Sequence, residues 1–161
     1  MKYLLLSLAA LSCLVSCTSG DNEVTPSPTP DTDPVKIPIN ISMNVWTRVT
    51  DTDYESGDKV GIYVVNYQGS SSGTLQSSGN HVDNMCFTYT GNWTPDSDIY
   101  WKDDTTQADF YCYYPYGKPS DIAAYPFSVK TDQSRQVDYK ASEFLWGKAS
   151  GVNPTYKAVP I

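Results

Sequence analysis

Few residues in this 161-residue sequence could carry catalysis or bind a metal. His81 is the sole histidine, and no serine or cysteine in a nucleophile motif accompanies it, so we interpret it as a surface residue. Four carboxylates flank one aromatic segment without the spacing of a calcium loop, and we interpret them as solvated turn acids: Asp96, Asp98, Asp103 and Asp104. The sequence therefore predicts no enzyme activity, no metal site and no cofactor.

The N-terminal residues give a more definite prediction, which concerns a cysteine. An apolar run over residues 3–15 is shorter than the roughly 20 residues of a membrane span and fits a secretory signal. The run ends in Leu14-Val15-Ser16-Cys17, which resembles a bacterial lipobox. We therefore predict a lipoprotein signal peptide over residues 1–16, cleavage between Ser16 and Cys17, and lipidation of Cys17 with acyl chains such as palmitate.

Two further cysteines, Cys86 and Cys112, remain in the predicted mature chain. An exported protein lies in an oxidising compartment, where disulfides persist. Both residues occur in strand-like segments, so a cross-strand disulfide is one interpretation. Two buried thiols are the other, because cysteine packs well as a small apolar residue. The sequence leaves both open.

The amino-acid composition limits the classes of molecule that the protein can bind. The formal net charge is −7 and the sequence pI is near 4.4. Nucleic acid binding needs a basic surface, and this sequence has no basic cluster, so nucleic acid is not expected as a partner. The 13 Tyr, 10 Gly and 11 Pro favour strands and turns over helices. The length suits one domain of ordinary size.

The first expected segment of the mature chain is a tether. Residues 17–36 combine the predicted lipidated cysteine with a stretch rich in Pro, Ser, Thr and Asp. Such a composition cannot build a core and favours extended backbone. The tether would separate a membrane anchor from a folded body over residues 37–161.

The body reads as a series of strands. Residues 37–45 alternate apolar and polar side chains, which is typical of a half-buried strand, and residues 68–80 predict a long flexible loop rich in Ser and Gly. One helical turn is expected near residues 139–144. Turn signals separate the further predicted strands, at residues 59–67, 83–90, 93–101, 108–114 and 125–129. The pattern predicts an all-β, antiparallel β-sandwich.

The C-terminal residues 156–161 look like the opening of another strand. We therefore expect a sandwich that is incomplete at the C-terminus and exposes an edge. Either the chain is a fragment or another polypeptide fills the slot. Aromatic side chains of the body could stack on a sugar, although packing in the core is the simpler interpretation: Trp93, Trp101, Tyr111, Tyr113, Tyr114 and Tyr116.

Several short motifs occur together in an order typical of one family. Thr47-Arg48 ends the first expected strand, and the next strand begins with Gly57-Asp58-Lys59-Val60-Gly61-Ile62-Tyr63. Later motifs follow in the same order: Trp93, Tyr100-Trp101, Asp109-Phe110-Tyr111-Cys112-Tyr113-Tyr114-Pro115-Tyr116 and Phe144-Leu145-Trp146-Gly147. Over residues 37–161 the chain resembles the fimbrillin-like proteins of Bacteroidetes, in which a lipobox and a tether are also usual.

The resemblance implies a β-sandwich of transthyretin-like topology, here a truncated N-terminal domain, and a structural or anchoring role in type V pilus-like fimbriae. In that family an arginine-specific protease removes the first strand, and a strand from a neighbouring subunit fills the groove. The bond between Arg48 and Val49 matches the processing position; an exposed arginine that stays uncut is the alternative.

The resemblance also implies other fimbrial subunits as partners and a lipid-anchored, surface-exposed position at the outer membrane. The alternative function is that of a surface lipoprotein adhesin that binds a carbohydrate or a host protein.

Overall fold

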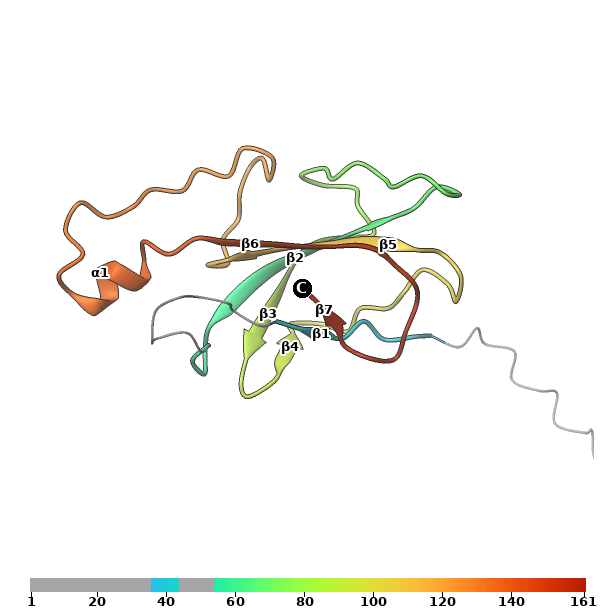
Figure 1. Ribbon diagram of the computed structural model, residues 1–161, viewed down its shortest axis with the longest axis horizontal. Helices are drawn as coiled ribbons and strands as arrows, with labels where there is room; N and C mark the ends of the chain where they lie inside the picture. Colours follow the sequence, from blue (N-terminus) through green and yellow to red (C-terminus); the bar gives the residue numbers. More distant parts are fainter. Residues whose placement is uncertain (1–35, 44–53) are drawn as a thin grey trace, which may run out of the picture. The chain divides into compact units, whose positions relative to one another are not determined.

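The computed structural model describes residues 36–43 and 54–161, and all structural statements below concern these ranges. Within them the chain forms a five-stranded sheet, a two-stranded sheet and one short helix (Figure 1). The all-β fold class predicted from the sequence is confirmed.

The five-stranded sheet is antiparallel throughout, with strand order β4-β3-β2-β5-β6. Its strands are β2 (Lys59–Asn66), β3 (Val82–Tyr89), β4 (Trp93–Pro95), β5 (Ala108–Tyr114) and β6 (Leu145–Val152). The central strand β2 is buried on both faces, which explains its nearly continuous apolar sequence.

A second layer contains β1 (Ile41–Ser42) and β7 (Val159–Pro160) and lies on one side of the five-stranded sheet (Figure 1). These two strands pair in parallel, with Ile41 opposite Val159. The sandwich predicted from the sequence was antiparallel, and this pair differs from it. The strands can run in parallel because the whole five-stranded sheet connects them, whereas a tight turn would force an antiparallel pair.

The main hydrophobic core fills the space between the two layers. Val60, Ile62 and Val64 alternate along one face of β2 and are fully buried. The other buried members of this core come from both layers: Ile37, Ile39, Ile41, Val82, Phe87, Trp101, Ala108, Phe110, Cys112 and Val159. Burial of each large apolar side chain contributes roughly 1.5–3 kcal/mol, so this interface dominates the stability of the fold.

The opposite face of the sheet carries a smaller core of Tyr63, Tyr113 and Ile122. Long connections rather than a sheet lie on this side: the loop of residues 67–81 and the loop of residues 115–135 (Figure 1). The second loop leads into α1 (Gln136–Lys140), a five-residue helix without a buried side chain.

Several predicted elements differ from the observed ones. The strand predicted over residues 93–101 is limited to Trp93–Pro95, and the helix lies at Gln136–Lys140 rather than near residues 139–144. Residues 125–129 form no strand, and the rings of Tyr125 and Phe127 instead lie 5.3 and 5.1 Å from the ring of Phe144. The strand predicted over residues 37–45 is regular only at Ile41–Ser42 within the described part, since its neighbours change along its length. Strand β6, in contrast, was not among the strands predicted from the sequence.

Candidate functional site: the first-strand groove

Residues 36–43, the first-strand segment, lie between two other segments and form backbone hydrogen bonds with both. On one side, Ile39 N–H donates to the carbonyl of Ile99, and Trp101 N–H donates to the carbonyl of Ile37, both at 2.9 Å. The segment therefore runs antiparallel to residues 99–101 along this edge, as the bridge between Pro38 and Tyr100 also indicates.

The other edge of the segment meets β7. Val159 N–H donates to the carbonyl of Asn40 and Ile161 N–H donates to the carbonyl of Ser42, both at 2.9 Å. Pro38, which has no N–H, comes before the first of these bonds, so its missing donor leaves no gap in the ladder. We call the slot between residues 99–101 and β7 the first-strand groove.

Side chains of the segment alternate between the core and the outside. Ile37, Ile39 and Ile41 are 9%, 2% and 5% exposed and belong to the main core, whereas Asn40 is exposed. At roughly 1.5–3 kcal/mol for each buried isoleucine, the segment contributes several kcal/mol to the fold. Spacing of two residues between buried positions also fixes the register, because a shift by one residue would turn all three outward.

The groove ends in a cluster of sulfur and aromatic groups. The Met43 sulfur lies 3.3 Å from the sulfur of Cys112 and 4.0 Å from the hydroxyl oxygen of Tyr54. Burial raises the pKa of the Cys112 thiol to about 12, so it stays protonated at neutral pH. At the other end, the Lys36 ammonium lies 5.5 Å from the centre of the Tyr100 ring. The groove therefore holds the segment by apolar contacts and backbone hydrogen bonds rather than by ion pairs.

Four residues predicted to carry processing lie outside the described residues. These are Ser16 and Cys17 at the predicted lipoprotein cleavage site, and Arg48 and Val49 at the predicted protease site. The described part of the first strand precedes the range that contains Arg48.

Cys86 and Cys112 are both free and buried. Cys86 pairs with Gly61, and Cys112 pairs with the neighbouring Ile62, so β2 separates them and their side chains point to opposite faces of the sheet. Two strand spacings place their Cα atoms about 10 Å apart, beyond the 7 Å or so that a disulfide can bridge. The structure therefore contradicts the disulfide interpretation and shows two buried thiols.

The aromatic residues divide between core and surface. Trp101 and Tyr113 are 5% and 1% exposed, as the core-packing interpretation expects. Trp146 is 46% exposed, and its ring centre lies 6.1 Å from that of Tyr111. The Lys148 ammonium lies 4.8 Å above the Tyr111 ring. Together Tyr111, Trp146 and Lys148 form an outer aromatic surface on β5 and β6.

Sequence reasoning missed one buried charge. Asp109 is 1% exposed, its Oδ1 accepts the Gly151 N–H at 2.8 Å, and its Oδ2 lies 3.0 Å from the Lys148 ammonium. An aspartate within an otherwise apolar strand was the available signal. The sequence alone could not identify Gly151 and Lys148 as its partners, because that pairing depends on the register between β5 and β6.

Among residues 36–43 and 54–161, no group of three or more His, Cys, Asp and Glu side chains is placed to hold a metal ion. In the same ranges, no helix is both long and apolar enough to cross a membrane.

Comparison with known proteins gives consistent matches. The model of the family described as fimbrillin-like matches residues 47–161. A candidate fimbrium subunit of Bacteroides uniformis, Fim1C, is 31% identical over 152 residues, which cover 91% of this chain and 48% of that protein. The chain thus spans about half the length of this curated relative.

Two solved structures are also similar. A candidate cell adhesion protein of Bacteroides uniformis superimposes with a TM-score of 0.51 at 26% identity, over 78% of this chain and 46% of that one. A fimbrial protein of Bacteroides ovatus gives a TM-score of 0.51 at 21% identity, over 70% of this chain and 24% of that one, and supports the fold alone. Because the family model covers most of the body, the chain belongs to the fimbrillin-like family.

Proposed function

We propose that this chain is a subunit of cell-surface fimbriae and that it assembles by β-strand exchange at the first-strand groove. One observation carries the proposal: residues 36–43 are inserted between residues 99–101 and β7, with backbone hydrogen bonds along both edges. Family membership and the similarity to a candidate fimbrium subunit support it.

Removal of the first-strand segment would leave a groove that favours another strand. The Trp101 and Val159 N–H groups and the Ile99 carbonyl would lose their partners, and an unpaired buried backbone group is costly. The apolar core side chains that pack with Ile37, Ile39 and Ile41 would also become exposed to water. A strand with apolar side chains at alternate positions restores both kinds of contact, which is the physical basis of strand addition.

Anchoring and processing complete the proposal. Lipidation at Cys17 would hold the uncut chain at the outer membrane, and cleavage between Arg48 and Val49 would separate the first strand, together with the lipidated cysteine, from the rest of the body. Both sites occur in the sequence at positions that suit these roles. The segment in the groove lies between the two sites, so one cut at Arg48 would separate it from the sheet that it covers.

A displacement experiment tests the groove. The chain is cut with an arginine-specific protease, and a fluorescent peptide with the sequence of residues 36–43 is added in excess. We expect the labelled peptide to bind the cut chain and to bind the uncut chain far more weakly. A peptide in which the isoleucine of position 39 is replaced by aspartate should bind at least tenfold more weakly, because a charge would enter the core. Equal binding of the two peptides would contradict the proposal.

Adhesion to a carbohydrate or a host protein is the second candidate function. The outer aromatic surface favours it, because Trp146 is half-exposed beside Tyr111 and aromatic faces suit ligands of both kinds. On a glycan array, Trp146→Ala should lose retention while Tyr139→Ala, an exposed aromatic on α1, keeps it. Equal retention of the two variants would exclude this surface as the binding site.

A further inference from the structure

One edge of the first-strand groove, the main chain of residues 99–101, is held from behind by a single side chain. Within residues 36–43 and 54–161, this main chain is hydrogen-bonded to the first-strand segment and to His81, and to no other residue. The Nε2 atom of His81 lies 2.7 Å from the carbonyl oxygen of Tyr100. When the first strand leaves, His81 is therefore the partner that remains.

The His81 contact acts on the same peptide unit as one of the hydrogen-bond donors of the groove. The Tyr100 carbonyl and the Trp101 N–H belong to one planar trans peptide, so they point in opposite directions. His81 contacts the carbonyl on one side, and the N–H faces the Ile37 carbonyl at 2.9 Å on the other. Fixing the carbonyl therefore also fixes the direction of the N–H. A hydrogen bond at one end of a peptide unit also polarises it and strengthens the bond at the other end.

His81 is the donor in this contact and belongs to the part of the chain that keeps the groove. A carbonyl oxygen only accepts, so Nε2 carries a proton in either protonation state of the ring. The other partners of Tyr100 lie on the first-strand segment: Pro38 forms a bridge with it, and the Lys36 ammonium lies 5.5 Å from the centre of its ring. Those contacts are lost with the first strand, whereas the His81 contact stays.

The sheet and a hydrogen-bonded turn fix the position of His81. It directly precedes β3, whose first residue, Val82, is buried in the main core. The Asp83 carboxylate accepts the N–H groups of Gly79 and Asn80 at 2.8 and 3.0 Å. The Ser- and Gly-rich sequence predicted a flexible loop here, whereas the end of this loop is tied to β3. The donor is thus placed independently of the groove that it supports.

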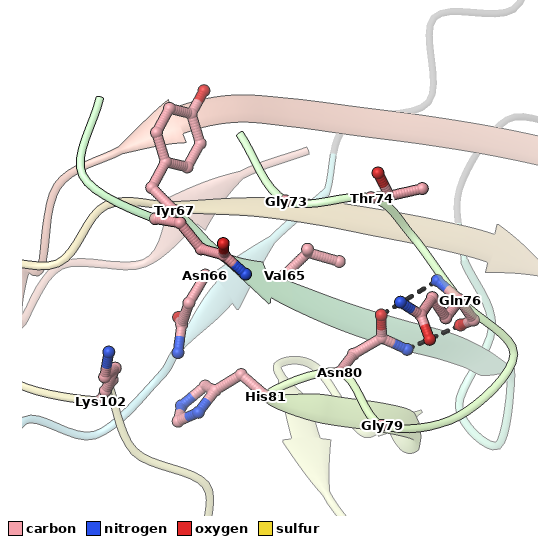
Figure 2. A pocket seen from close by; sticks show the side chains of 11 residues that line it. Val65, Asn66, Tyr67, Gly73, Thr74, Gln76, Gly79, Asn80, His81 and Lys102 are labelled. Carbon is pink, nitrogen blue, oxygen red and sulfur yellow. Dashed lines mark hydrogen bonds between the residues drawn. The ribbon is translucent and has the colours of Figure 1, made fainter. Parts of the chain in front are cut away.

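Figure 2 shows the His81 ring directed from the start of β3 toward the chain segment that carries Lys102. Both residues line a polar pocket beside the end of β2, and Lys102 directly follows Trp101. The Trp101 side chain is buried, with its ring 5.3 Å from that of Phe110. Core packing therefore anchors the indole, while the His81 contact sets the rotation of the peptide unit before it.

We propose that His81 is a positioning residue of the first-strand groove, which keeps the Trp101 N–H directed at the place of the incoming strand. The proposal rests on strand exchange as the proposed function. An edge that is formed in advance lowers the cost of ordering the groove when a strand binds. Without the His81 contact, the peptide unit is free to rotate and its hydrogen bond to the strand is weakened. His81 thus has a role beyond that of a surface residue, as which it was interpreted from the sequence.

Amide hydrogen exchange in the uncut chain tests whether His81 fixes this edge. His81→Phe keeps a ring without a donor, whereas His81→Gln places an amide N–H near the position of Nε2. We expect the Trp101 N–H to exchange at least about threefold faster in His81→Phe, and His81→Gln to restore the slow rate. The Val159 N–H, on the opposite edge of the groove, should change by less than about twofold. Unchanged exchange at Trp101, or equal acceleration at Trp101 and Val159, would overturn the proposal.

Release of a bound strand tests whether the edge serves the groove. All variants carry Arg135→Ala, so that an arginine-specific protease cuts only at Arg48. A fluorescent peptide with the sequence of residues 36–43 replaces the first strand, free peptide is removed, and release is followed after unlabelled peptide is added. We expect release from His81→Phe to be about three- to tenfold faster than from the unmodified groove, and His81→Gln to restore slow release.

Lys102→Met is the matched control, because it changes another residue of the same pocket that has no contact with the Tyr100 carbonyl. It should release the peptide as the unmodified groove does. Equal release from His81→Phe and the unmodified groove would overturn the positioning role. Failure of the peptide to enter the unmodified cut chain would instead contradict strand exchange, and the hydrogen-exchange comparison would still decide whether His81 fixes the edge.

Discussion

Asp109 illustrates how a single charged side chain is accommodated inside the sheet. It faces two residues of β6 at a break in the register, where Ala108 pairs with Val152 and Phe110 with Ala149. The extra residue frees the Gly151 N–H, and the Asp109 carboxylate accepts it.

The alternation of Ile37, Ile39 and Ile41 could be predicted from the sequence, because it depends on neighbours along the chain. The role of Asp109 could not, because it depends on a partner strand.

The pH dependence of stability should report on Asp109. Burial alone would raise its pKa, but the Gly151 N–H and the Lys148 ammonium outweigh it and hold the pKa below the ordinary value. Its contribution is therefore present above the unfolded-state pKa of about 3.9 and is lost as the pH falls toward the lower folded-state pKa. We expect Asp109→Asn to lower the free energy of unfolding by about 2 kcal/mol at pH 7, and to flatten the loss of stability below pH 4.

Urea unfolding at pH 3–7 measures this difference. Lys148 is 42% exposed and can be hydrated when its partner is lost, so most of the effect should come from the Gly151 contact. Asp104→Asn, an exposed acid on a loop, is the control and should leave the curve within about 0.5 kcal/mol. If Asp109→Asn lowered the free energy of unfolding by the same amount at every pH from 3 to 7, the lowered pKa of Asp109 would be contradicted.

Gly61 is a second residue whose neighbours determine its identity, because they leave no space for a side chain. A Cβ at this position would lie 2.1 Å from Cε1 of Tyr113 and 2.7 Å from Oδ1 of Asn84. Tyr113 cannot move away, because it is buried and donates to the carbonyl of Gly117 at 2.7 Å. We expect Gly61→Ala to lower the free energy of unfolding by at least about 2 kcal/mol in urea, against less than about 0.5 kcal/mol for Lys59→Ala at the exposed start of the same strand. Equal stability of the two variants would contradict this packing.

At the level of elements, β2, β3 and β5 were predictable and β6 was not. The first three combine apolar periodicity with clear turns at each end, and their observed bounds lie within one residue of the predicted ones. Strand β6 includes two glycines, an alanine and a lysine, so its sequence signal is weak and its pairing with β5 decides its structure. Residues 125–129 show the reverse case, in which apolar side chains pack against Phe144 without forming a strand.

The arrangement of β3, β2 and β5 makes a prediction about thiol chemistry. Cys86 and Cys112 lie on the two strands that flank β2, and burial raises the pKa of both thiols. We expect mass spectrometry under non-reducing conditions to show no peptide that links them. Alkylation at pH 8 should be at least a hundredfold slower in the folded chain than in urea, because the thiolate is scarce and the sulfur is covered. A linked Cys86–Cys112 peptide from an unreduced sample would contradict the strand order.

For the whole molecule, the informative feature is how segments distant in the sequence meet in the second layer. Residues 37–42 are bordered by residues 99–101 on one side and by residues 159–161 on the other. No local pattern predicts this arrangement, because parallel pairing of β1 with β7 requires the complete five-stranded sheet between them. The sequence predicted the first strand, and the family resemblance implied its exchange, but the edges of its groove come from the fold.

A prediction about the whole molecule concerns its assembly into oligomers. The chain contains two arginines, Arg48 and Arg135, so an arginine-specific protease distinguishes two outcomes. Cleavage at Arg48 would free the first strand and open the groove, whereas Arg135 precedes α1, which has no buried side chain. We expect protease-treated chain to form oligomer ladders in mild detergent with Val49 as the new N-terminus. Arg135→Ala should keep the ladders and Arg48→Ala should abolish them. Ladders that persist in Arg48→Ala, or a Val49 terminus without any ladder, would show that the groove is not filled by a second copy of this chain.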